Sequence, residues 1–233
     1  VYRLPDGVSF EAGALAHVAT FPMAAIRKCG LELGESAIVM GQGILGQLAV
    51  MLLKCAGAAP VIAVDPVAEK REEALRLGAD FAFDPTAADF RERVLAVCPR
   101  EDSGIYTGAN ALGANVAIEV TGFGEGLRNV LDVMAPMGRV ALLGCTRDSD
   151  FSVDYYHKVH GRGVSLIGAH TWARPAHDSS RGLFTHRDDA KAFLRLLTLG
   201  RLSVDGYVAD VRPPAECGEV YARLAAGGAF PVT

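Results

Sequence analysis

The sequence predicts an α/β fold in which a doubly wound, parallel sheet of six strands carries helices on both faces. Short apolar runs alternate with longer amphipathic runs along most of the 233 residues. The apolar runs are rich in β-branched residues and are apolar at both odd and even positions, which is typical of strands buried on both faces. Strands that alternate with helices over short connections favour a parallel sheet.

Six runs have the length and composition of strands, and the segments between them have the pattern of helices. The expected strands are Ser36–Met40, Val61–Asp65, Phe81–Phe83, Asn115–Val120, Arg139–Gly144 and Val164–Ala169. The expected helices between them are Ile44–Ala56, Ala68–Leu77, Ala87–Val97, Glu125–Met134 and Val153–His160.

Three further stretches depart from this alternation. Residues 1–30 are expected to form an entry arm and a helix that begins near Pro22, because proline suits the first turn of a helix. Residues 99–114 and 172–187 are loop-like in composition and are expected to be loops. The remaining expected elements are a helix at Asp188–Leu199, a strand near Tyr207–Val211 and a helix at Pro214–Ala225.

Composition narrows the function classes. Hydrophobic residues make up 50% of the chain, charged residues 21%, and the net charge is −4, which describes a globular protein with a sizeable core. The charges are mixed and form no basic stripe, so no nucleic acid partner is expected. No apolar run reaches the roughly 18 residues of a membrane span. The five cysteines form no Cys-x-x-Cys pair, so we expect reduced thiols and a cytoplasmic location.

A glycine motif carries the first functional signal. Gly41, Gly43 and Gly46 form a G-x-G-x-x-G pattern, with Ile44 and Leu45 between the last two glycines. The pattern alone is weak in a chain with 26 glycines, but it follows an expected strand and opens an expected helix. The first glycine permits a tight turn, the second lets the backbone touch a pyrophosphate, and the third lets the helix approach the strand. The helix N-terminus offers N–H groups and partial positive charge to a diphosphate.

Asp65 supplies the second half of this dinucleotide-binding pattern. It ends the second expected strand, nineteen residues after Gly46, where a carboxylate can accept hydrogen bonds from the adenosine ribose. The same charge would repel the 2′-phosphate of NADP by about 4 kcal/mol at a separation of about 4 Å. NAD is therefore the expected cofactor, although Lys70 and Arg71 would soften the repulsion. The alternative role for Asp65 is the N-cap of the following helix.

With these residues the chain resembles the medium-chain dehydrogenase/reductase superfamily, and within it the zinc-type alcohol and sorbitol dehydrogenases. The resemblance covers nearly the whole chain. It is carried by residues 4–14, 34–41, 77–80, 117–122 and 138–144, and by Asp65 with Lys70, which resemble the family's ribose-binding pair. The resemblance implies a Rossmann sheet that binds NAD, in an enzyme that transfers a hydride between the nicotinamide and a small alcohol or carbonyl substrate.

The resemblance also implies where the nicotinamide lies and how the chain assembles. The matching residues at the ends of the later strands are Val120, Thr121, Gly144, Cys145, Ala169, His170 and Thr171. His170 is the best-placed polar side chain among them, and its alternative is an ordinary loop histidine. Family members pair their last strand across a two-fold axis, so a homodimer through strand 164–169 is implied.

The family's N-terminal catalytic domain has no counterpart in the chain. The resemblance makes residues 1–17 a remnant of that domain, 18–171 the NAD-binding domain, and 172–233 a C-terminal part that returns to the catalytic domain. The catalytic residues are then expected mostly outside the chain, with zinc possible in the full-length enzyme. His17 stands where sorbitol-type members carry one zinc ligand, but a lone histidine among apolar neighbours indicates a core or pocket residue, so no metal site is expected.

Two other patterns and three rival functions complete the sequence evidence. His157 and His160 lie three residues apart on an expected helix, but they lack an evident third ligand, and a solvated helix face is expected. Tyr155 and Lys158 lack the four-residue spacing of the tyrosine–lysine pair of short-chain dehydrogenases. The alternatives to an NAD-dependent dehydrogenase are a non-catalytic NAD-binding module, a zinc-independent reductase of the same superfamily, and a methyltransferase with a related glycine loop.

Overall fold

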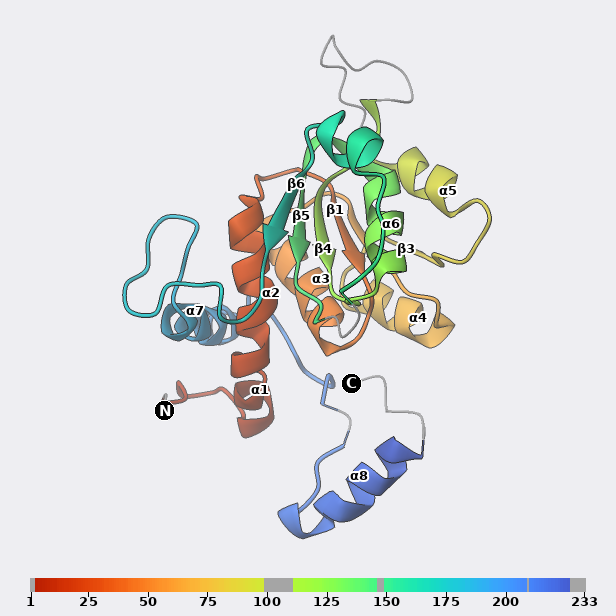
Figure 1. Cartoon of the computed structure of the whole chain (residues 1–233). Helices are drawn as coiled ribbons and strands as arrows, with labels where there is room; N and C mark the ends of the chain where they lie inside the picture. The colour runs from red at the N-terminus through yellow and green to blue at the C-terminus, as the bar shows by residue number, and fades with distance from the viewer. Residues whose placement is uncertain (1–2, 99–110, 146–148, 209, 227–233) are drawn as a thin grey trace.

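A computed structural model describes residues 3–98, 111–145, 149–208 and 210–226 (Figure 1). Its centre is a six-stranded sheet with the order β3-β2-β1-β4-β5-β6, in which every pairing is parallel. The predicted fold class, a doubly wound parallel α/β sheet, is therefore confirmed. The strands are β1 Ala37–Met40, β2 Val61–Val64, β3 Phe81–Phe83, β4 Ala114–Glu119, β5 Met134–Leu142 and β6 Ser165–Gly168.

The strand order reverses direction beside β1, and this reversal creates the place for a ligand. Strand β1 pairs with β2 on one side and with β4 on the other, so the crossovers that leave it pass over opposite faces of the sheet. All four residues of β1 and all four of β2 are buried. In such sheets ligands bind in the crevice outside the carboxyl ends of the strands, at the point of reversal.

Helices cover both faces of the sheet and bury two apolar clusters against it (Figure 1). One cluster is formed with α2, α3 and α7, and the other with α5 and α6. The helices are α1 Phe10–Ala14, α2 Ala16–Cys29, α3 Ile44–Ala56, α4 Ala68–Arg76, α5 Phe90–Val97, α6 Gly124–Val133, α7 His186–Thr198 and α8 Cys217–Ala225, with a π-helix η2 at Tyr156–His160 and a 3-10 helix η3 at Pro214–Glu216.

The prediction that a helix begins near Pro22 is wrong, because α2 already begins at Ala16 and Pro22 lies inside it. A proline inside a helix removes one backbone hydrogen bond. The buried face of α2 nevertheless continues through this position, with Ala19, Met23 and Ile26 in the core. Packing of an amphipathic face is the main source of helix stability in a folded protein, and here it outweighs the lost bond. The expected boundary between residues 17 and 18 consequently falls inside α2.

The strand predicted near Tyr207–Val211 is also wrong, since the described residues of this segment form turns and irregular structure. The Tyr207 amide donates to the carbonyl oxygen of Val204, which closes a turn, and the Tyr207 hydroxyl donates to the carbonyl oxygen of Ile44. Tyr207 is buried against α3 and takes part in no strand pairing, whereas a short run of apolar and β-branched residues resembles a strand in the sequence.

Several helices and strands begin or end at other residues than predicted. Helix α7 begins at His186 because the Thr185 side chain caps it by accepting from the Asp188 amide. Strand β5 begins at Met134, which was expected to end a helix. The segment predicted as a helix at Val153–His160 is the short π-helix η2, and the helix predicted from Pro214 is divided into η3 and α8. Most of the predicted loop at 99–114 lies outside the described residues, and its last residue opens β4.

Ion pairs between Arg27, Arg174 and Asp189 join α7 to α2. Asp189 is fully buried at the start of α7, and its Oδ1 accepts from Arg27 Nε of α2 at 2.9 Å. Arg174 Nη1 lies 3.7 Å from the other carboxylate oxygen. Burial raises the pKa of Asp189, and the two arginines oppose that rise. In the part of the chain that the structure describes, no helix has the length and apolarity needed to cross a membrane.

The five cysteines give the first testable prediction. Cys29 and Cys98 are buried, and burial raises the pKa of both thiols to about 12, whereas Cys55, Cys145 and Cys217 are exposed. Because alkylation requires the thiolate, iodoacetamide at pH 8 should modify the three exposed cysteines of the folded chain and all five after denaturation. Mass spectrometry of intact protein counts the adducts. Rapid modification of Cys29 in the folded chain would contradict this packing.

Candidate functional site

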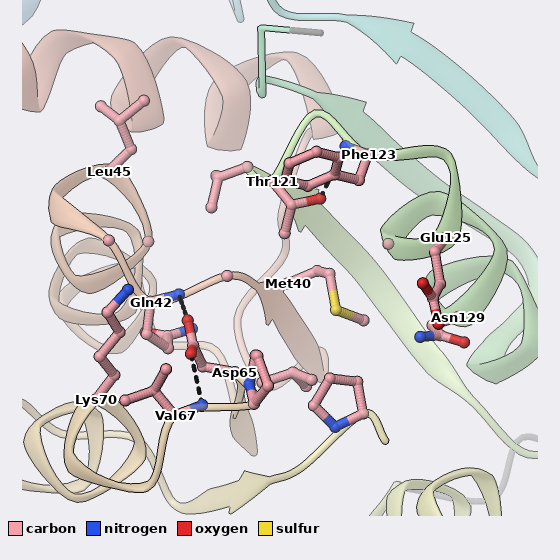
Figure 2. Close-up of a pocket in the computed structure, with 18 of the residues that line it drawn as sticks. Met40, Gln42, Leu45, Asp65, Val67, Lys70, Thr121, Phe123, Glu125 and Asn129 are labelled. Carbon is pink, nitrogen blue, oxygen red and sulfur yellow. Dashed lines mark hydrogen bonds between the residues drawn. The ribbon is translucent and has the colours of Figure 1, made fainter. Parts of the chain in front are cut away.

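A cavity of about 570 Å³ opens at the carboxyl ends of β1, β2 and β4 (Figure 2). Its lining comes from segments far apart in the sequence: residues 40–46, 64–67 and 70, the turn at 85–86, residues 120–121 and 123, and residues 125, 126 and 129 of α6. The cavity thus occupies the crevice at which the strand order reverses. The sequence predicted a ligand site at this edge, and nine of the predicted residues line the cavity: Gly41, Gly43, Ile44, Leu45, Gly46, Asp65, Lys70, Val120 and Thr121.

The glycine motif forms the tight turn between β1 and α3. Gly41 has a φ of +97°, a conformation that residues with a Cβ rarely adopt. A Cβ at Gly46 would overlap the carbonyl oxygen of Gly41, so the helix reaches this close to the turn only with glycine there. Gly43 is different, because a Cβ there would meet nothing within 4 Å. The turn therefore presents a bare stretch of backbone to the cavity.

The first turn of α3 borders the cavity, and no side chain neutralises the partial positive charge of this helix N-terminus. Gly43 is the N-cap residue, and α3 has neither a side-chain cap nor an acidic residue in its first turn. The first N–H groups of a helix have no partner within the helix, and they carry a partial positive charge. This end of the cavity can consequently bind a negatively charged group.

Asp65 stands at the end of β2 and is only 5% exposed. Its Oδ2 accepts from the backbone amide of Gln42 at 2.7 Å, and its Oδ1 accepts from the amide of Val67 at 2.9 Å (Figure 2). Both bonds hold the carboxylate at the cavity wall, and each oxygen keeps lone pairs for further donors. The predicted alternative, an N-cap role, is not observed for α4, since its N-cap residue is Val67.

Two basic residues follow Asp65 and differ in what they can reach. Lys70 lines the cavity, and its ammonium group makes no hydrogen bond or ion pair with the described residues. Arg71 instead donates to the carbonyl oxygens of Asp65 and Pro66 and to the Asp84 carboxylate. Only Lys70 is therefore placed to meet a ligand beside Asp65.

The opposite wall comes from the end of β4 and the start of α6. Thr121 bonds to the buried carboxylate of Glu119, which also accepts from the amide of Gly122. Phe123 is 73% exposed at the rim. The sequence analysis missed Phe123 and the α6 residues, together with Gln42, Val67, Pro85 and Thr86. Those outside α6 share one signal, which is their position shortly after an expected strand, where such sheets hold ligands. The α6 residues carry no such signal.

Five predicted residues do not line this cavity. Gly144 lies against the backbone of Gly122, where a Cβ would overlap it, and Ala169 is buried in the core. Cys145 and His170 are exposed, and the His170 Nδ1 accepts from the amide of Trp172. Thr171 lines a separate hollow together with Trp172, Arg174 and His186. Their assignment to the nicotinamide stays a prediction.

The histidines form no metal site with the described residues. His17 Nδ1 lies 2.8 Å from Nε2 of His186, and its ring packs edge-on against Phe21. His157 pairs with Asp154, and His160 stacks on Tyr156. Among the residues described, no group of three histidine, cysteine or acidic side chains is placed to hold a metal. The described residues therefore do not by themselves form a site that fits a zinc ion.

The glycine turn gives a matched pair of variants. Gly46→Ala places a methyl group against the Gly41 carbonyl, and we expect a loss of about 2 kcal/mol, which is roughly 4–8 °C in Tm. Gly43→Ala adds the same methyl group in open space and should cost less than about 1 kcal/mol, because the loss of an N-cap glycine is partly offset by the lower entropy of the unfolded chain. Thermal unfolding followed by circular dichroism compares the two. Equal stability of the variants would contradict the close approach of α3.

Comparison with known proteins assigns the chain to a family. D-guloside 3-dehydrogenase of Shigella flexneri is 25% identical over 219 residues, which is 94% of this chain and 59% of that protein. Galactitol-1-phosphate dehydrogenase of Escherichia coli superposes with a TM-score of 0.79 at 20% identity, over 99% of this chain and 61% of that one. A putative zinc-binding dehydrogenase of Sinorhizobium meliloti, solved with NADP, superposes with a TM-score of 0.67 at 24% identity, over 88% and 53%.

The chain spans between 53% and 61% of the length of these relatives, which leaves part of each without a counterpart here. Residues 45–180, which are more than half of the chain, match the family model described as zinc-binding dehydrogenase. This match begins in the first turn of α3 and includes Asp65, the α6 residues of the cavity and β6. The chain belongs to the zinc-binding dehydrogenase family.

Proposed function

We propose that the chain is the NAD(H)-binding part of a dehydrogenase that transfers a hydride between the nicotinamide and a small alcohol or carbonyl compound. One observation carries the proposal: the bare glycine turn and the Asp65 carboxylate border one cavity. Diphosphate and ribose are joined in a dinucleotide, so a site for one beside a site for the other suits that ligand. Membership of a dehydrogenase family supports the chemistry.

The diphosphate and the adenosine ribose each have a counterpart in the cavity. The diphosphate would lie at the N-terminus of α3, where Gly43 leaves room and the N–H groups of the first turn can donate. The adenosine ribose would donate its hydroxyl groups to Asp65, and Lys70 would donate to the same ribose. The nicotinamide would lie toward Val120 and Thr121 and the ends of β5 and β6. Bound NAD supplies the hydride acceptor, and these residues hold and orient it.

The charge of Asp65 favours NAD over NADP. A 2′-phosphate would stand next to a carboxylate that is nearly buried and already fixed by two amides. Like charges about 4 Å apart repel by about 4 kcal/mol at an effective dielectric constant near 20. A structural relative at 24% identity was solved with NADP, so the fold alone does not exclude that cofactor. The choice in this chain therefore depends on the local charges, and Lys70 is the one cation among the described residues that line the cavity.

We place the catalytic residues mainly in a domain that residues 1–17 and 172–233 adjoin, as the coverage of the relatives suggests. No step is assigned to zinc, because the described residues do not assemble a site for it. All five cysteines are unpaired, which suits a reducing compartment such as the cytoplasm. The partner of the bound cofactor would be a small alcohol or carbonyl substrate.

Calorimetric titration with NADH and NADPH tests the proposal. The wild type should bind NADH at least about tenfold more tightly than NADPH, and Asp65→Asn should remove most of this preference by removing the charge. Asp80→Asn is the matched control, since Asp80 also accepts a backbone amide, from Val61, but lies outside the cavity. A folded wild type that binds neither dinucleotide would overturn the proposal, and equal binding of both would overturn the role of Asp65 alone.

We also propose that the chain forms a homodimer through β6. This strand is at the edge of the sheet, and three of its four residues are exposed, including Leu166. An exposed edge strand invites pairing with a second copy. Sedimentation velocity should give a dimer for the wild type and a monomer for Leu166→Lys, while Leu199→Lys, an exposed leucine at the end of α7, should remain a dimer. A monomeric wild type would contradict this assembly.

A further inference from the structure

The cavity extends past Asp65 to a pair of polar side chains on α6 that the diphosphate and ribose do not use. Glu125 and Asn129 are four residues apart, so they lie on the same face of the helix, and both line the cavity. Figure 2 shows them side by side on the wall opposite Lys70 and Asp65. We propose that Glu125 and Asn129 recognise the base of the bound dinucleotide and select a 6-aminopurine over a 6-oxopurine.

The inference rests on the proposed function, because the position of the base follows from the positions of the other groups. With the diphosphate at α3 and the ribose at Asp65, the base attached to that ribose points away from α3. The rest of the cavity is lined by Val67, Pro85, Thr86 and Phe123 and by the α6 residues, and the Thr86 hydroxyl already donates to Asp84. The α6 residues are therefore the polar groups that meet the edge of the base.

The walls of this part of the cavity suit a flat aromatic ring. Phe123 is 73% exposed and Val67 is 41% exposed, although both are large apolar side chains. Pro85 adds a further apolar surface between them and the end of β3. Stacking of a base on an aromatic side chain contributes about 1–3 kcal/mol and does not distinguish one purine from another. Discrimination must therefore come from polar groups at the edge of the ring.

Glu125 and Asn129 have the hydrogen-bonding capacity for this task. Neither side chain bonds to another described residue, although Asn129 is half-buried. An asparagine amide can pair with the amino group and a ring nitrogen of adenine at once, and a carboxylate can accept from an exocyclic amino group. Hypoxanthine carries an oxygen in place of that amino group. It would set an acceptor against the Glu125 carboxylate and leave a half-buried partner unpaired.

The experiment compares NADH with reduced nicotinamide hypoxanthine dinucleotide, which differs only at this position of the base. Calorimetric titration of the wild type should show about tenfold tighter binding of NADH, the effect of one lost hydrogen bond to a charged or half-buried group. Asn129→Ala should reduce the ratio by weakening NADH. Glu125→Gln should reduce it by strengthening the hypoxanthine analogue, because glutamine can donate to the oxygen.

Glu69→Gln is the matched control, because Glu69 holds the second position of α4 as Glu125 does in α6, yet it lies outside the cavity. This variant should keep the wild-type ratio. Because Glu125 is exposed, Glu125→Gln should fold normally, so it still tests the proposal if Asn129→Ala does not fold. Equal affinity of the wild type for both dinucleotides would overturn the base recognition and leave the proposed function standing. Failure to bind either dinucleotide would overturn both.

Discussion

The hydrogen bond from the Gln42 amide to the Asp65 carboxylate, 2.7 Å long, joins the glycine turn to the neighbouring strand. It exists because β1 and β2 are parallel and in register, with Met40 beside Val64, so the residues that follow each strand emerge together. The second oxygen of Asp65 holds the amide of Val67 in the same way. One carboxylate thereby fixes the start of α3 and the segment before α4, and the cavity lies between these two elements.

This constraint explains why much of the fold could be predicted from the sequence. Strands β1 and β2 are buried on both faces, so their apolar runs are continuous and end at polar or glycine positions. Gly41 and Gly46 are required by the backbone itself, the first by its positive φ and the second by the approach of α3. Signals of this kind are local, and a local signal is visible in the sequence before any tertiary contact is known.

The features that escaped prediction depend on contacts between distant segments. Pro22 is tolerated in α2 because the helix residues before and after it are buried on the same face. Tyr207 is buried because it packs on α3. Glu125 and Asn129, on the opposite wall of the cavity, have the sequence pattern of residues on the solvated face of a surface helix. The connection from β4 to α6 brings both side chains to the cavity that Asp65 borders. No spacing rule in the sequence predicts that they lie near Asp65.

The attachment of α7 to α2 also has a consequence for how the chain folds as it is made. Arg27 and Asp189 are separated by 162 positions, and their ion pair brings the C-terminal part of the chain against the first long helix. Contacts between residues so far apart slow folding, because a large loop must close before they form. During synthesis the face of α2 that α7 covers would remain exposed until most of the sheet has left the ribosome. Apolar surface that is exposed during this interval is prone to aggregation.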